Sequence, residues 1–239
     1  MILAANRDEF LARPTAPLAW WQDRQDILAG RDLQDGGTWL GVSRSGNFGV
    51  LTNYREKFKN NGTISRGEIV TDYISSDLLP KRYLNELQDR SARYRGFNLL
   101  LGDAWSFWYY SNRGKGFMEV PPGYHGLSNH LFNSDWPKVE RGKTLLAKVL
   151  EQKSFTPDSL FAILQDTSQP AEHLLPDTGV GREWEKMLAP IFITSDTYGT
   201  RSSAILMVRD NGSITFSERT FSHGHHGPQT ENERCFTIE

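Results

Sequence analysis

The sequence predicts an α+β fold with antiparallel sheets. Strand patterns and helix patterns come in runs rather than in strict alternation, and neighbouring strand patterns are joined by short polar turns that contain glycine. The last third of the chain is β. A parallel, doubly wound sheet would alternate strands with helices instead. We interpret residues 1–239 as one domain, because no internal repeat or low-complexity tract interrupts them.

The first part of the chain predicts three strands. Residues 2–5 form a short apolar run, and we expect a buried strand whose end carries the polar cluster of residues 6–9. Residues 38–43 and 48–53 follow as strand patterns, joined by the polar segment 44–47. These two strands should pair in antiparallel fashion.

Two helices are predicted next. Ser65 and Glu68 have the spacing of a capping box, and apolar residues then continue at helical spacing until Pro80. A second short helix with one apolar face should run from Pro80 toward Ser91.

The centre of the chain adds another pair of strands and two more helices. Residues 97–102 and 105–110 are rich in aromatic and apolar side chains, which favours strands, and residues 114–126 are rich in glycine and proline, which favours a loop. A helix pattern resumes at Asp135, and Thr156 followed by Pro157 is typical of the start of a further helix.

The last part of the chain predicts a long surface loop followed by strands. Residues 165–181 are polar and contain two prolines and two glycines, which indicates the loop. The expected strands cover residues 191–195, 203–209, 214–218 and 235–238.

The charge balance excludes several function classes. The chain has 27 Lys and Arg against 29 Asp and Glu, a net charge of −2. Nucleic-acid and anionic-membrane binders normally carry a basic excess, so we expect neither partner. The apolar runs fall far short of the roughly 20 residues that span a membrane. The single cysteine, Cys235, cannot form an internal disulfide, and no charged-then-apolar leader opens the chain, so we expect a cytoplasmic protein with Cys235 in its core.

A metal site is not expected. His223, His225 and His226 lie close together, and imidazole is a good metal ligand. However, no carboxylate or cysteine stands at a zinc-type spacing from them, which favours a solvated loop.

The strongest candidate for a functional site is the cluster Asn6, Arg7, Asp8 and Glu9. Four polar groups after an apolar strand are costly unless they pair with one another or face a cleft. Taken alone, the cluster is compatible with a structural ion pair between arginine and a carboxylate. Three other blocks place amides or guanidinium groups beside strand patterns, at residues 52–55, 126–129 and 198–201. Each alone is typical of a turn or cap. Together they favour a polar cleft at the strand ends.

The ordered blocks of the sequence resemble the NRDE family. The resemblance covers nearly the whole chain, and many ordered blocks are far more specific than one four-letter motif. The matching blocks are residues 2–10, 13–14, 36–41, 51–54, 66–68, 96–99, 126–129, 198–201 and 215–219.

This family is similar to the N-terminal nucleophile hydrolases, in particular the cysteine branch that cleaves amides. The similarity implies a four-layer αββα sandwich of antiparallel sheets. In that branch an N-terminal cysteine attacks the amide and its own α-amine serves as base. Carried onto this sequence, Arg7 would stabilise the nucleophile and Asp8 would hold the α-amine. Asn53 and Asn129 would line the oxyanion site, and Arg201 would position the catalytic group.

The start of the sequence departs from this pattern. Family members typically open with Met-Cys and a first strand, whereas this sequence opens with Met1 and Ile2. We favour a truncated or late-started chain over loss of the strand. A missing edge strand leaves unpaired backbone groups beside an apolar run, so we expect the sheet edge next to residues 2–5 to be open or covered by a partner.

Two functional classes follow, with the binding role favoured. NRDE proteins are linked to the handling of haem, and the 28 aromatic residues offer material for an apolar slot, so the resemblance implies a protein that binds and helps to traffic a small hydrophobic ligand, with haem as cargo and no required cofactor. No haem-attachment motif occurs, so binding would be noncovalent. The alternative is a hydrolase of amide-containing ligands, and a non-catalytic scaffold is a third option. The expected ligand-binding residues are Asn6, Glu9, Trp39, Tyr54 and Ser128.

Overall fold

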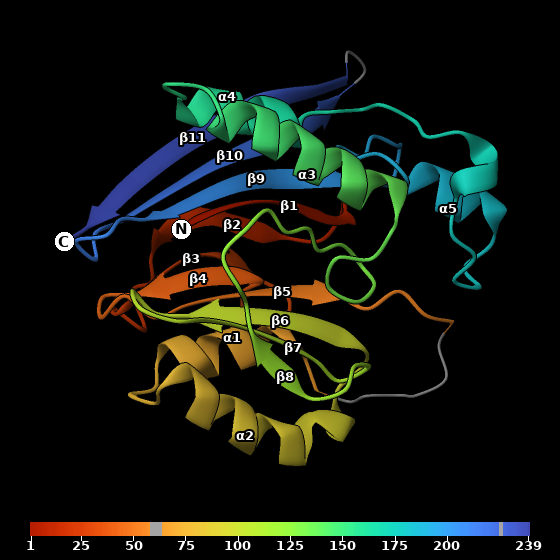
Figure 1. The fold of residues 1–239 in the computed structure, drawn as a ribbon. Coiled ribbons are helices and arrows are strands. Elements are labelled where there is room, and N and C mark those ends of the chain that lie inside the picture. The colour runs from red at the N-terminus through yellow and green to blue at the C-terminus, as the bar shows by residue number, and fades with distance from the viewer. Residues whose placement is uncertain (58–63, 225–226) are drawn as a thin grey trace.

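A computed structural model describes residues 1–57, 64–224 and 227–239, and it contains two antiparallel sheets packed face to face (Figure 1). The four-stranded sheet has the order β1-β9-β10-β11 and the seven-stranded sheet runs from β2 to β8 in chain order. The strands are β1 (Ile2–Phe10), β2 (Thr15–Trp20), β3 (Ile27–Asp32), β4 (Leu40–Ser43), β5 (Phe48–Asn53), β6 (Phe97–Gly102), β7 (Phe107–Ser111), β8 (Phe117–Glu119), β9 (Tyr198–Val208), β10 (Ile214–Gly224) and β11 (Gly227–Ile238).

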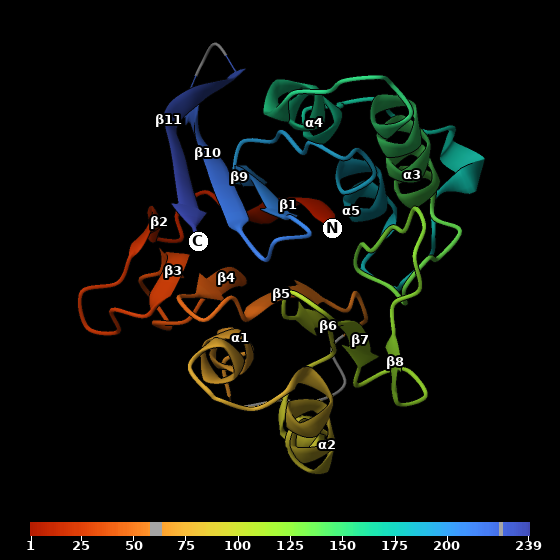
Figure 2. The ribbon, with the colours of Figure 1, turned by 60° about the vertical axis from the view of Figure 1, so that its left-hand side comes forward.

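Helices cover the outer face of each sheet, so the predicted four-layer αββα sandwich is confirmed (Figure 2). Helices α1 (Gly67–Ile74) and α2 (Pro80–Arg90) pack on the seven-stranded sheet, and α3 (Pro137–Leu150) and α4 (Pro157–Leu164) lie over the four-stranded sheet. The short helix α5 (Arg182–Met187) lies beyond the end of α3.

Each interface between layers is a separate hydrophobic core. Leu28 and Val50 of the larger sheet meet Leu206 and Phe216 of the smaller sheet in the central core. A second core lies between the larger sheet and helices α1 and α2, and a third, centred on Phe161, lies under α3 and α4. The larger sheet is therefore buried on both faces, which explains why every residue of β6 is buried and why its sequence does not alternate.

Most of the strands and helices predicted from local patterns are present. Strands β4 and β5 pair in antiparallel register, as do β6 and β7, and α2 begins at Pro80 as expected. The predicted start of α4 is also confirmed: Thr156 is the N-cap and forms a capping box with Ser159. No described helix is long and apolar enough to cross a membrane.

The first strand differs from its prediction. Strand β1 extends to Phe10, so residues 6–9 lie within the strand rather than after it, and residues 2–5 are only partly buried. The reason is that β1 is the outermost strand of its sheet and pairs, within the described residues, with β9 alone. No strand of the described residues pairs with the outer edge of residues 2–5.

Several other predictions were wrong. Strands β2 and β3 were not predicted, residues 191–195 form no strand, and β8 lies within the expected loop 114–126. Ser65 does not cap α1: the helix begins at Gly67, ends at Ile74, and the Glu68 carboxylate accepts a hydrogen bond from Tyr94 instead. Cys235 is exposed on β11, the outer strand of its sheet, rather than buried in a core.

The two glycines at residues 36–37 bring backbone segments together. A Cβ atom added to Gly37 would lie only 2.6 Å from the carbonyl carbon of Gly67. The close approach allows the amide of Thr38 to donate to the Gly67 carbonyl at 3.3 Å. This contact places the first turn of α1 beside Trp39.

We expect Leu206→Ala to lower the free energy of unfolding by about 2–5 kcal/mol, because Leu206 is fully buried between the two sheets. Leu79→Ala is the matched control. Leu79 is 71% exposed, so its truncation should cost no more than about 0.5 kcal/mol. Urea denaturation followed by tryptophan fluorescence measures both. Equal losses in the two variants would contradict the assignment of the central core.

Candidate functional site

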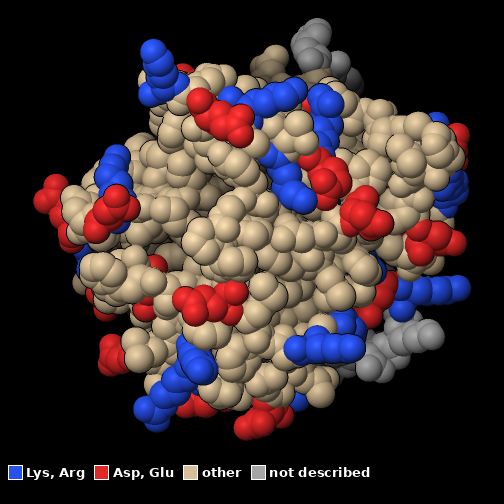
Figure 3. Space-filling model, viewed as in Figure 1, with Lys and Arg blue, Asp and Glu red and all other residues tan. Residues whose placement is uncertain are grey.

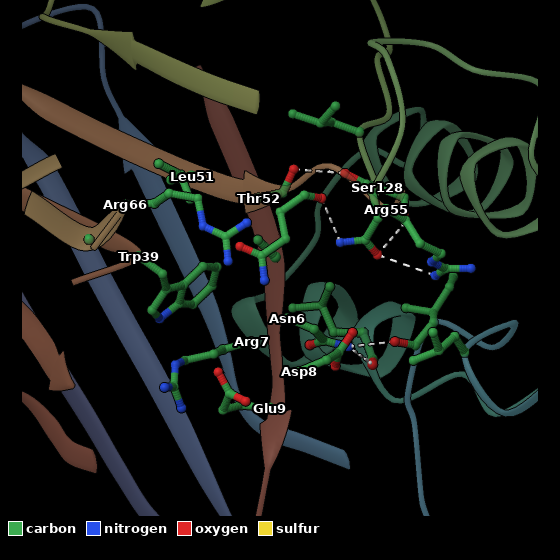
Figure 4. A pocket seen from close by; sticks show the side chains of 18 of the residues that line it. Asn6, Arg7, Asp8, Glu9, Trp39, Leu51, Thr52, Arg55, Arg66 and Ser128 are labelled. Carbon is green, nitrogen blue, oxygen red and sulfur yellow. Dashed lines mark hydrogen bonds between the residues drawn. The ribbon is translucent and has the colours of Figure 1, made fainter. Parts of the chain in front are cut away.

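A cavity of about 760 Å³ lies along β1, where the strand faces the end of β5, the start of α1 and helix α3 (Figure 4). Its wall mixes charged and apolar side chains. On the outer face shown in Figure 3, by contrast, cationic and anionic side chains are interspersed around a broad uncharged area. The cavity therefore brings charged and apolar side chains together along one strand.

Strand β1 contributes six consecutive residues to the cavity wall, Ala4 to Glu9. Consecutive side chains of a strand point to opposite faces of the sheet. Strand β1 is an edge strand, so one of its sides has no neighbouring strand and is accessible from both faces of the sheet. Side chains of neighbouring residues can therefore reach the same cavity on that side. A bulge accompanies this arrangement: Arg7 pairs with Ser202 and Asp8 with Thr200, so Arg201 is the extra residue of β9.

Arg7 is a buried cation without an anionic partner. It is 8% exposed, and its Nη1 donates to the hydroxyl of Thr15 at 3.1 Å. No carboxylate of the described residues forms an ion pair with it. Burial lowers the pKa of Arg7, and the attraction of Glu9 and Asp32 only partly opposes this effect. Because a buried unpaired charge is costly, this guanidinium is suited to receive an anion.

Asp8 is buried on the other side of the strand. Its Oδ1 accepts a hydrogen bond from the Thr200 hydroxyl at 2.7 Å. Burial raises the pKa of Asp8, and the positive charge of Lys138 opposes this shift most strongly. The buried carboxyl therefore depends on a nearby cation.

Arg66 forms the opposite wall with Trp39, and Figure 4 shows both side chains projecting into the cavity. Arg66 precedes the first turn of α1, and its Nη1 donates to the Gly96 carbonyl at 3.0 Å. Burial, reinforced by repulsion from Arg95, lowers the pKa of Arg66 to about 10. Like Arg7, it forms no ion pair with a carboxylate in the described part of the chain.

Arg13, by contrast, forms ion pairs with three carboxylates. Its guanidinium lies 2.5 Å from Asp32, 2.7 Å from Asp35 and 3.8 Å from Glu9. These carboxylates neutralise Arg13, whereas Arg7 and Arg66 form no ion pair with a carboxylate of the described residues.

The segment before α3 is attached to the end of β5 by hydrogen bonds. Thr52 donates to the Ser128 carbonyl at 2.7 Å, and the side-chain amide of Asn129 donates to the Asn53 carbonyl at 3.0 Å (Figure 4). The Asn53 side chain is exposed and forms no hydrogen bond within the described residues. Its amide is free to donate to a ligand.

Arg55 and Glu185 form a buried ion pair behind the cavity. The two side chains are 7% and 2% exposed, and Nη1 of Arg55 lies 2.7 Å from Oε2 of Glu185. Thr178 donates to the other Glu185 oxygen through its amide and its hydroxyl, at 2.8 and 2.6 Å. Burial lowers the pKa of Arg55, and Glu185 opposes the shift.

The structure brings together most of the site residues predicted from the sequence. The residues that line the cavity are Asn6, Arg7, Asp8, Glu9, Trp39, Asn53, Ser128 and Asn129. Tyr54 and Arg201 do not line it. The ring of Tyr54 packs on His130, and Arg201 donates to the carbonyls of Phe10, Leu11 and Arg13, where it ties the end of β1 to the following turn.

Asn6 lines the cavity, but its side chain is fully engaged. Its amide donates to the Leu164 and Ile191 carbonyls at 2.7 and 3.0 Å, and its oxygen accepts from Ser203 at 2.6 Å. Asn6 therefore fixes β1 against the end of α4.

Several residues of the site were not singled out as site residues from the sequence: Arg55, Arg66, Lys138, Glu185 and Thr200. Arg55, Arg66 and Thr200 lie in or beside the matching blocks, which is a signal that could have found them. Lys138 has only a weak signal, a cation in the first turn of a helix, where the helix dipole disfavours it.

The histidines near the cavity have structural partners. His125 lines the cavity, but Nε2 lies 2.8 Å from the Pro121 carbonyl and Nδ1 lies 3.0 Å from the amide of Asn133. His223 bonds to the Thr200 carbonyl, whereas His225 and His226 lie outside the described residues. No group of three or more potential metal ligands occurs among the residues that the structure describes.

Comparison with known proteins agrees with the predicted family. A family model described as Transport and Golgi organisation 2 matches residues 1–223. The chain belongs to this family. The Transport and Golgi organization 2 homolog of Mus musculus is 36% identical over 237 residues, which cover 92% of this chain and 86% of the relative, and the human homolog gives the same values. Transport and Golgi organization protein 2 of Drosophila melanogaster is 28% identical over 248 residues, covering 93% of this chain and 86% of that protein.

Among solved structures, this member of the Transport and Golgi organisation 2 family is similar to a variant of the conjugated bile acid hydrolase from Clostridium perfringens. The TM-score is 0.52 at 8% sequence identity, and the match covers 98% of this chain and 88% of the hydrolase. At this identity the likeness shows the fold alone, and it confirms the expected similarity to N-terminal nucleophile hydrolases in architecture.

We expect Arg55→Met to lower the free energy of unfolding by about 3–5 kcal/mol, because it leaves the Glu185 carboxylate buried without its cation. Replacing both members, Arg55→Met with Glu185→Leu, should recover most of this loss. Arg82→Met removes the cation of an exposed pair with Glu86 and should cost about 0–1 kcal/mol. Urea denaturation compares the variants, and a double variant as unstable as Arg55→Met would contradict the pairing.

Proposed function

We propose that this protein binds a small hydrophobic ligand that carries anionic groups, and that it helps to traffic this ligand, with haem as the candidate cargo. The observation that carries the proposal is the cavity along β1, whose wall combines apolar side chains with the guanidinium groups of Arg7 and Arg66, which form no ion pair with a described carboxylate. Its volume of about 760 Å³ lies within the range of roughly 300–1,000 Å³ typical of sites for small organic ligands.

The charge of the cavity wall supports an anionic ligand. Among the described residues, seven Lys and Arg line the cavity against four Asp and Glu, although the whole chain has a net charge of −2. The positive charge is therefore concentrated here rather than spread over the chain. Guanidinium groups bind carboxylates through charge-assisted hydrogen bonds, and these are strongest in sites with little water.

The apolar part of the wall supports a ligand with a hydrophobic body. Trp39 and Leu51 lie on the side of the larger sheet, and aliphatic side chains of α3 and α4 lie on the other side. The apolar lining residues are Trp39, Leu51, Ile64, Leu127, Val139, Leu146, Ile163, Leu164, Leu188 and Ile191.

Haem fits this description, because it combines a flat apolar ring system with two propionate groups. Arg7 and Arg66 are the groups we assign to the propionates. His125 would have to give up a hydrogen bond to ligate iron. We therefore assign retention of the cargo to apolar packing and guanidinium contacts, which suits reversible, noncovalent binding.

Hydrolysis of an amide-containing ligand is the second candidate function. The likeness in fold to a bile acid hydrolase and the buried Asp8 carboxyl in the cavity favour it. A scaffold without a ligand is favoured less, because the protein's own side chains do not fill the cavity.

A haem titration followed in the Soret band tests the binding function. We expect saturable binding, and we expect Arg7→Met and Arg66→Met each to weaken it by about tenfold or more, since each removes one charge-assisted contact. Arg44→Met is the matched control, because Arg44 is exposed and lies outside the cavity lining. With the dimethyl ester of haem, which lacks the propionate charges, the two cavity variants should bind like the unsubstituted protein. Equal weakening of both ligands would overturn the assignment of the guanidinium groups.

The second candidate function is tested with a panel of acyl amides. Turnover that is lost in Asp8→Asn, with no saturable haem binding in either protein, would replace the trafficking proposal by hydrolysis. Thermal melting shows whether Asp8→Asn remains folded, because the Asp8 side chain accepts only the Thr200 hydrogen bond among the described residues.

A further inference from the structure

Lys138 occupies an unusual position in the cavity wall. It is the second residue of α3, after Pro137, and its side chain reaches the inner end of the cavity, beside Leu188. Its Nζ donates to the Leu188 carbonyl at 3.0 Å. This hydrogen bond holds the amine in place, and a lysine amine can form further bonds at the cavity wall that Lys138 lines.

The charged groups around Lys138 come from three other parts of the chain. Asp8 belongs to β1, Arg55 follows β5, and Glu185 belongs to α5. Glu185 is already paired with Arg55 and bonded by Thr178, and Asp8 accepts from Thr200. None of the carboxylates in the described residues lies within 4.0 Å of the Lys138 amine.

This environment disfavours the ammonium form of Lys138. Burial lowers the pKa of Lys138 to about 8, with Arg55 adding to the shift and Asp8 opposing it. The first turn of a helix also disfavours a cation. A desolvated lysine beside another cation has a large neutral fraction near neutral pH, and the neutral amine is the nucleophilic form.

We propose that Lys138 is a carbonyl-reactive amine, and that the inner end of this cavity takes a small anionic aldehyde or ketone as a reversible covalent ligand. The lone pair of Nζ attacks the carbonyl carbon, and the electron pair of the C=O bond moves to the oxygen. Both hydrogens of the amine end on that oxygen, which leaves as water when the C=N bond forms. The step needs no oxidant or reductant.

The anionic part of the ligand follows from the same wall. Arg7 is buried and Arg66 is partly buried, neither forms an ion pair in the described residues, and both line the same cavity as Lys138. A ligand held by these guanidinium groups would be delivered to the amine at raised local concentration. This inference goes beyond the proposed function, because it does not depend on haem being the cargo.

Trapping with pyridoxal 5′-phosphate and sodium borohydride tests the proposal. This probe is an aldehyde with a phosphate group, and borohydride reduces its imine to a stable secondary amine. After brief exposure at pH 7.5, peptide mapping should show at least about tenfold more label on Lys138 than on Lys148, an exposed lysine of the same helix, because each unit of lowered pKa raises the neutral fraction about tenfold.

Lys143 is the matched control within the cavity. It lines the same wall, but its Nζ forms an ion pair with Glu140 at 2.9 Å. Mapping uses the unsubstituted chain, so the result does not depend on whether a variant folds. Label on Lys143 or Lys148 equal to that on Lys138 would overturn the proposal.

The pH dependence provides a second, independent readout. Labelling of Lys138 should level off above about pH 8, at the lowered pKa of its amine, whereas the reaction of the probe with free Nα-acetyl-lysine should keep rising toward about pH 10. Lys138→Met should remove the fast phase of labelling and Lys143→Met should retain it. A pH profile of Lys138 labelling that runs parallel to the profile of the free amine would contradict the inference.

Discussion

The edge position of β1 is the constraint on which the site depends. The strand has one hydrogen-bonded neighbour in the described residues, β9, and its other side borders the cavity. In the interior of a sheet, Arg7 and Asp8 would face two different layers and could not meet a common ligand. At the edge, both lie on the border of one space. The bulge at Arg201 adds a local twist that turns the following residues of β1 away from a regular register.

The charges around the cavity fall into two groups with different roles. Arg13 with Asp32 and Asp35, and Arg55 with Glu185, are closed ion pairs that satisfy one another. Arg7, Arg66, Asp8 and Lys138 have hydrogen bonds but no ion pairs among the described residues, and burial shifts the pKa of each toward its neutral form. Because buried charges without partners are costly, a fold that gathers them at one place favours the binding of a ligand that compensates them. The closed pairs hold the wall in shape, and the charges without ion pairs are the ones that the proposed ligands would compensate.

The elements predicted correctly from the sequence are those that depend on interactions between residues close together in the chain. Glycine in the turn between β4 and β5 and the helix start at Thr156 and Pro157 act within a few residues, and both were predicted correctly. Strands β2 and β3 were not predicted, because their sequences show no clear alternation of apolar and polar residues. Contacts with other layers bury them instead. The same limit applies to the site. The cluster at residues 6–9 was visible in the sequence, whereas Lys138 and Glu185 become significant only when α3 and α5 fold back onto β1 and β5. Cys235 was misplaced for a related reason, since an apolar pattern does not reveal that its strand is the outermost one.

Side chains of the smaller sheet form hydrogen bonds with β2, an edge strand of the larger sheet. Leu18 of β2 donates its amide to Glu218 of β10 at 2.6 Å and accepts from Arg234 of β11 at 3.0 Å. Glu218 is buried, and its burial raises the pKa of the carboxyl while the bond from Leu18 opposes the shift. The side chains of Glu218 and Arg234 thus take the place of the backbone partner that β2, an edge strand of the larger sheet, lacks. At the opposite edge of the smaller sheet, β1 is attached to β2 by the hydrogen bond from Arg7 to the Thr15 hydroxyl at 3.1 Å. These bonds join the larger sheet to both edges of the smaller one, and the cavity lies along β1.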